Sequence, residues 1–345
     1  MREAWVIGLH SRDSRGAIHL IRDIVYRKHG RGCTTQASYA HERSASVLCS
    51  PRLMLSSLEY LLPWDFSPTV LLICSLSAVL YVRGVGVLKK AGTPPAAWRS
   101  ICFFLGLGFD YAALQTYVDY LSQHMFWVHR LQHLVLHHIA PALLVASAPS
   151  VALRYGTPLW LRDRVVDPLT QQRAMRALLR FAQNPLVALL LFVGLIYYWL
   201  TPLVHFAAML DVHRYLLMNW GMAVDGILFW WLMLASRDRQ RQLALGYGTR
   251  VLLLCIAALL QILLGAYIAL HRSVLFEVYG ACGRAWALSP LVDQQLGGLI
   301  TWIPAAMMSG VGIIVVLYHV MQESRGLQRG SVALAVGQSR SLSRG

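Results

Sequence analysis

Long apolar runs recur through this 345-residue sequence, from about residue 67 to about residue 320. Each run has roughly 20 residues, the length that an α-helix needs to cross about 30 Å of hydrocarbon. Hydrophobic residues make up 57% of the chain and charged residues only 14%, whereas about a quarter of a soluble protein is charged. The sequence therefore predicts an all-α membrane protein.

Seven membrane-spanning helices are expected, near residues 67–88, 99–117, 121–148, 185–205, 213–235, 246–270 and 294–320. Lysine and arginine concentrate in the connections after the first, third and fifth spans and after the last. Basic residues next to membrane spans favour the cytoplasmic side. This predicts a multi-pass membrane protein with its N-terminus outside and its C-terminus in the cytoplasm. The same basic loops explain the net charge of +15 without nucleic acid as a partner.

The remaining segments flank this predicted membrane domain, residues 54–321. Residues 1–53 are basic, have no sustained apolar face and lack the apolar core of a signal peptide. They are expected to be disordered. With the N-terminus outside, their positive charge would oppose the charge rule, so Met54 is interpreted as the true start. Residues 322–345 are expected to form a polar cytoplasmic tail.

The third predicted span carries five histidines and an arginine. Within it Met125, His129, His133 and His137 recur every fourth residue. Four residues advance about 40° around a helix axis, so these side chains are expected to form one stripe. Ionisable groups are costly in hydrocarbon and mark functional sites by default. His124 and His138 are expected to point away from this stripe.

Two histidines at positions i and i+4 of a helix can bind one metal ion, as in the zinc-binding HExxH motif. The motif's glutamate is missing here, because Arg130 follows His129. We therefore expect no enzymatic activity. Imidazole nitrogen with the thioether of Met125 favours copper. The charge-based orientation puts His129, His133, His205 and His213 on the outer side of the membrane, so the predicted site would exchange metal with the periplasmic or extracellular compartment.

Three alternatives remain open from the residues alone. Histidines can act as interhelical hydrogen-bonding groups, and Asp225 could pair with Arg130 or with a protonated histidine. A b-type haem could lie between His213 and either His129 or His133, since haem iron takes one axial histidine from each side. A copper permease would need a polar path through the inner half, where the sequence offers few ligands.

Four stretches resemble one known family. They are LPWDFSPTVLLICSLSAVLYVRGV (62–85), VHRLQHLVLHHIAPALLVASAP (128–149), GILFWWLML (226–234) and DQQLGGLITWIP (293–304). Together they make the chain from Met54 to Val320 similar to the seven-span CtaG-like family of bacterial cytochrome c oxidase assembly factors. Asp293 opens the last of these motifs and joins the possible supporting residues His205, His124 and Asp225.

The resemblance implies a role in maturing a haem–copper oxidase by supplying copper at the periplasmic face. It implies oxidase subunits or their assembly intermediates as partners, together with periplasmic copper chaperones. His129 and His133 fall on the two histidines of the family motif. The chain departs from the family pattern at Arg130, at Leu200 with His205 a turn later, at Leu217, and at His137 and His138.

Overall fold

The computed structural model describes residues 67–234, 245–281 and 283–342, with side-chain surroundings described as far as residue 325. The described residues form helices and no strands. Residues 1–53, which are expected to be disordered, lie outside the described residues. Most side chains of the predicted tail, residues 322–345, also lie outside the described part.

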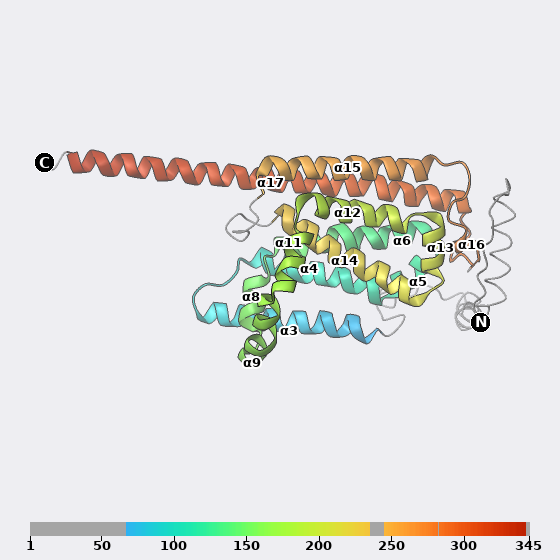
Figure 1. The fold of residues 1–345 in the computed structure, drawn as a ribbon, viewed down its shortest axis with the longest axis horizontal. Coiled ribbons are helices and arrows are strands. Elements are labelled where there is room, and N and C mark those ends of the chain that lie inside the picture. Colours follow the sequence, from blue (N-terminus) through green and yellow to red (C-terminus); the bar gives the residue numbers. More distant parts are fainter. Residues whose placement is uncertain (1–66, 235–244, 282, 343–345) are drawn as a thin grey trace, which may run out of the picture. The chain divides into compact units, whose positions relative to one another are not determined.

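Long helices dominate the described residues and run side by side (Figure 1). They are α3 (Pro68–Lys90), α4 (Ala97–Gln115), α12 (Pro185–Trp199), α14 (Val212–Leu234), α15 (Tyr247–Leu270) and α17 (Pro290–Leu342). By length and composition, α3, α14, α15 and α17 qualify as membrane spans, and the number rises to six if each of two bent helix pairs is one span. This confirms an all-α protein with several apolar membrane helices. The seven-span topology stays a prediction.

The third predicted span is not one continuous α-helix, which corrects the sequence expectation. A short helix, α5 (Tyr117–His124), ends at Met125, whose backbone is extended with φ −139° and ψ 125°. The chain then forms α6 (Phe126–Leu134), a π-helical turn η2 (Val135–Ile139) and α7 (Ala140–Ala146). Pro141 is the second residue after this turn and cannot donate a backbone hydrogen bond. Insertions of π-helical geometry often mark functional sites.

Aromatic side chains fill the interior of the bundle in two apolar clusters. One cluster is centred on Phe192 of α12 with Phe229 and Trp230 of α14, and the rings of Phe192 and Phe229 stack with centroids 3.7 Å apart. The other contains Phe126 of α6 and Phe276, stacked at 4.1 Å. The second cluster adjoins the histidines of α6.

Small residues allow the helices to approach closely, as membrane helix packing requires. The tightest contact joins α3 to α8 (Ser150–Gly156). A Cβ atom on Gly84 would lie 1.7 Å from the carbonyl oxygen of Ala152, and one on Gly156 would lie 1.7 Å from that of Leu80. Only glycine fits at these two positions, because backbone atoms occupy the space.

This packing predicts different effects for two neighbouring glycines of α3. Gly84→Ala should destabilise the protein by about 1–3 kcal/mol or more, because its methyl group overlaps the α8 backbone. Gly86→Ala is the matched control, since nothing lies within 4 Å of its added Cβ. Thermal unfolding in detergent should show a lower midpoint for the first variant only. Equal midpoints would contradict the α3–α8 contact.

Candidate functional site

The carboxylate of Asp293 holds the start of the histidine-bearing helix α6. Its two oxygens accept hydrogen bonds from the backbone amides of Phe126 (3.1 Å) and Trp127 (2.9 Å). Asp293 comes from α17 and is fully buried, and Arg284 donates a further, charged hydrogen bond to it. The first amides of a helix have no partner within that helix and attract a negative charge. A residue more than 160 positions away in sequence thus caps α6.

Three buried histidines gather one turn above this cap. The rings of His129 and His133 lie with their centroids 4.3 Å apart, as expected for positions i and i+4. His205 of α13 (Pro202–Met209) adds a third ring, 5.0 Å from that of His129 and nearly perpendicular to it. All three side chains are at most 1% exposed. The structure therefore brings one of the supporting residues next to the predicted pair.

The hydrogen bonds of His205 determine which of its ring nitrogens carries the hydrogen and which has the lone pair. Its Nδ1 lies 3.0 Å from the backbone carbonyl of Trp199. A carbonyl only accepts, so Nδ1 carries the hydrogen and donates it. Nε2 consequently accepts the hydrogen bond from the hydroxyl of Tyr279, at 2.9 Å. A backbone carbonyl that orients the opposite nitrogen is typical of histidines that bind metals.

The other two histidines have ring nitrogens without hydrogen-bond partners. Neither nitrogen of His129 makes a hydrogen bond of normal geometry within the described chain, although the Ser122 backbone carbonyl faces the ring. His133 Nε2 lies 3.2 Å from Asn219 Oδ1, while its Nδ1 has no partner among the described residues. Buried polar atoms are normally paired, and an unpaired group costs about 1–3 kcal/mol. These nitrogens are suited to a ligand.

A hydrogen-bonded network supports the histidine cluster from the side of α5 and α14. Asp119 Oδ1 accepts hydrogen bonds from the Tyr215 hydroxyl (2.7 Å) and from Gln132 Nε2 (2.8 Å). Ser122 Oγ also lies 2.9 Å from the Tyr215 hydroxyl. The sequence interpretation missed Tyr215, Gln132 and Tyr279, because it considered only histidines, methionine and carboxylates as members of the site. The sequence did offer one signal for this network: Gln132 is an amide side chain directly before the motif histidine His133.

The stripe predicted from the four-residue spacing divides in the structure. His137 lies in the π turn, where its Nε2 is 3.1 Å from Asp225 Oδ2, and its ring stacks on Phe192 at 4.1 Å. Of the partners considered for Asp225, the structure selects this histidine and not Arg130. His138 is also buried and lies 5.1 Å from the His137 ring. The π turn shifts the register, so a cluster of His129, His133 and His205 and a separate pair of His137 with Asp225 replace one stripe.

A small cavity separates these two groups. Its volume is about 10 Å³, which is room for about one water molecule. Its polar lining consists of Arg130, His133, His137, His138, Gln261 and Thr301. The guanidinium of Arg130 donates a hydrogen bond to Thr301 Oγ1 at 2.8 Å. The guanidinium of Arg130 thus places a positive charge where the histidine cluster borders the cavity.

The remaining predicted ligands lie apart from the three rings. The haem alternative requires His213 to face His129 or His133 across the bundle. In the structure His213 is instead exposed at the start of α14. His124 packs on Tyr120 in α5, away from the cluster as expected. Met125 is fully buried at the helix break, where it is the residue that precedes α6. Among the described residues, no three His, Cys, Asp or Glu side chains form a ready metal-binding group as they stand.

Comparisons with known proteins point to one family. The family described as "Cytochrome c oxidase caa3 assembly factor (Caa3_CtaG)" matches residues 79–323. Two curated relatives, the uncharacterized proteins Mb0105 of Mycobacterium bovis and MT0111 of Mycobacterium tuberculosis, are each 27% identical over 255 residues, covering 69% of this chain. The chain spans 36% of the length of each. No solved structure matches the chain.

The cap of α6 yields a stability prediction. Asp293→Ala should lower the free energy of unfolding by about 2–4 kcal/mol, because it removes a helix cap and leaves Arg284 without its charged partner. Asp163→Ala is the control, since that carboxylate is 62% exposed in an ion pair with Arg162 and should change stability by less than about 1 kcal/mol. Denaturant unfolding of both variants in detergent tests the difference. Equal losses would exclude a special role for the cap.

Proposed function

Because the chain belongs to the family of cytochrome c oxidase caa3 assembly factors, we propose that it carries copper for insertion into a haem–copper oxidase. The proposed ligands are His129, His133 and His205. The observation that supports this most directly is the set of buried imidazole nitrogens without hydrogen-bond partners on His129 and His133.

The donor set suits copper as a transferable cargo. Imidazoles bind copper well, and the three rings come from two helices, α6 and α13, at separations of 4.3 and 5.0 Å. Copper binding at His205 Nε2 would require the Tyr279 hydroxyl to move aside, since it now occupies that lone pair. The Tyr279 hydroxyl would compete with copper for this lone pair and so favour release of the metal. A copper carrier must release its metal to the acceptor protein. The site has no glutamate at the HExxH position, so we propose a carrier and not an enzyme.

The proposed topology has seven spans, with the N-terminus outside and the C-terminus in the cytoplasm of the bacterial inner membrane. The loop charges of the sequence support it. In this orientation α6 begins near the outer surface, so the three histidines exchange copper with the periplasm. The proposed partners are oxidase subunits or assembly intermediates, and periplasmic copper chaperones as donors. The matched region is only 36% of the length of each curated relative. The partners named here are therefore proposals for this chain and are not taken from those relatives.

The geometry favours this function over the two alternatives. Haem needs its macrocycle between two axial rings, yet His205 and His129 are only 5.0 Å apart and the nearby cavity has a volume of about 10 Å³. A permease would pass copper ions along the inner cavity, where the buried guanidinium of Arg130 would repel them. An optical spectrum of the purified protein tests the haem alternative: a sharp α-band on reduction would support it.

Substitution of the histidines should remove Cu(I) binding. We expect His129→Ala with His133→Ala to abolish binding by purified protein, measured by competition with a chromophoric Cu(I) chelator. His205→Ala should weaken it by about tenfold or more, by analogy with supporting residues of metal sites. His319→Ala is the control, because His319 lies 26 residues after Asp293 in α17, more than seven helical turns along that helix. Unchanged binding in the double variant would refute the site.

Deletion of the protein should lower the activity of the haem–copper oxidase in membranes. Added copper should restore part of that activity, because a higher metal concentration compensates for a lost carrier. Oxygen consumption by isolated membranes, with total haem measured alongside, provides the readout. Normal oxidase activity in the deletion strain would argue against the assembly role.

A further inference from the structure

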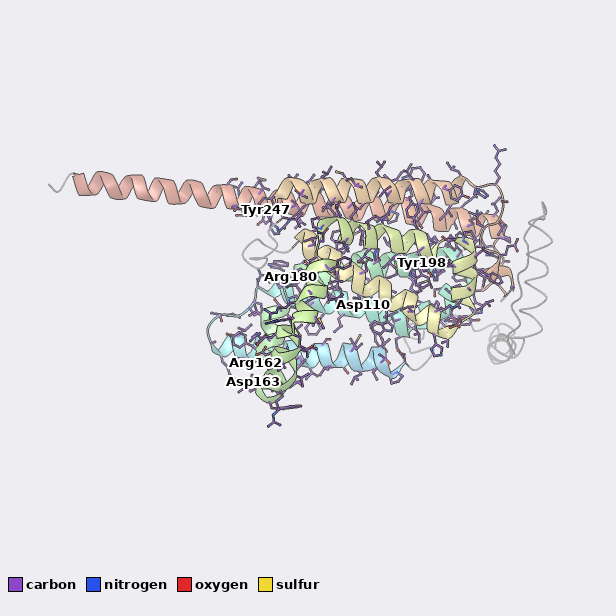
Figure 2. The ribbon with its side chains drawn as sticks, in the orientation of Figure 1. Asp110, Arg162, Asp163, Arg180, Tyr198 and Tyr247 are labelled. Atoms are coloured by element: carbon purple, nitrogen blue, oxygen red, sulfur yellow. The ribbon has the colours of Figure 1, made fainter. Side chains whose placement is uncertain are left out.

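The segment between α8 and α12 has large apolar side chains that nothing in the described chain covers. It contains α9 (Leu159–Leu161), η3 (Arg162–Val166), α10 (Asp167–Gln171) and α11 (Arg173–Ala182), and none of these helices has a buried residue. Trp160, Leu178 and Phe181 are each 60–63% exposed. Figure 2 labels Arg162, Asp163 and Arg180 on this segment, with Arg162 and Asp163 at the edge of the molecule.

The longest helix of this segment, α11, has two distinct faces. At 100° per residue, Arg173, Arg176 and Arg180 fall within about 60° of one another on the helix circumference. Met175 and Leu178 lie on the opposite face. None of the three arginines has an ion pair among the described residues, whereas Arg162 of the same segment pairs with Asp163 and Asp167, and Arg154 of α8 pairs with Asp167. Three unneutralised guanidiniums thus oppose an apolar face.

The direction of α11 places this helix along the membrane surface. It is bent by 70° from α12, which begins three residues later at Pro185. Asn184 caps α12 by accepting hydrogen bonds from the amides of Leu186 and Val187, so the turn is a defined helix boundary. Figure 1 shows α11 running across the direction of the long helices. If α12 crosses the bilayer, α11 lies close to the bilayer plane.

We propose that α11 is an interfacial helix that binds anionic phospholipids. Its apolar face inserts between acyl chains, and its three arginines bind lipid phosphates. A helix with one basic and one apolar face in the plane of the interface is the usual form of such a site, and guanidinium groups bind phosphate through paired hydrogen bonds. Trp160 of α9 is an aromatic residue of the kind found at membrane interfaces. Proximity to the bilayer favours lipid over a protein partner, and this inference does not depend on copper binding.

Hydrogen–deuterium exchange of the full chain in lipid nanodiscs tests the proposal. The amides of residues 173–182 should exchange more slowly when phosphatidylglycerol is added to phosphatidylcholine. Each arginine that contacts anionic lipid should contribute roughly fivefold to the protection. Raising the salt concentration should reduce the difference, since surface electrostatic attraction is screened. Equal exchange of α11 in both lipid compositions would overturn the proposal.

Two triple variants distinguish a lipid-binding site on α11 from nonspecific attraction between the protein's positive charge and anionic lipid. Replacing Arg173, Arg176 and Arg180 by Gln should remove the dependence on phosphatidylglycerol. The control, with Lys89→Gln, Lys90→Gln and Arg325→Gln, removes three exposed cations outside α11 and should retain it. Equal loss in both variants would mean nonspecific attraction and would overturn the site. Protection that appears only after purified oxidase is added, and not with anionic lipid, would identify a protein surface instead.

Discussion

The contact between the Asp293 carboxylate and the first amides of α6 sets the position of the histidines. Met125 has an extended backbone, so the chain begins a new helix inside an apolar region where water cannot satisfy free amides. Asp293 satisfies two of them, and Arg284 balances its charge. His129 follows one turn later. Its depth and direction therefore depend on how α17 packs against α6.

The polar groups behind this cap form two sets with different chemistry. In the first set, His129, His133 and His205 have lone pairs that are free or held only by a hydroxyl. In the second set, His137 is hydrogen-bonded to Asp225 and stacked on Phe192. The first set is suited to accept a ligand, and the second resembles a structural pair inside the bundle. Arg130 lies between them and makes passage of a cation from one to the other unfavourable.

Particular residues show how far the sequence could lead. The i, i+4 spacing correctly predicted that His129 and His133 share a face, because both lie within one regular α-helix. The same spacing extends the stripe to Met125 and His137 only if the helix keeps 3.6 residues per turn throughout. An extended residue at one end and a π turn at the other break that assumption. The family resemblance was confirmed over residues 79–323, whereas the predicted topology still rests on loop charges.

The sequence by itself determined the all-helical membrane class, the family and the central histidine pair, because these follow from hydropathy and local spacing. Only the tertiary structure selected His205 as the third ring and Tyr279 as its partner, and only it assigned Asp225 to His137. These contacts join residues 70 or more positions apart, and helix periodicity contains no information about which faces meet. Close packing of the helices in a medium without water decided them, because each buried polar group must find its partner on a neighbouring helix.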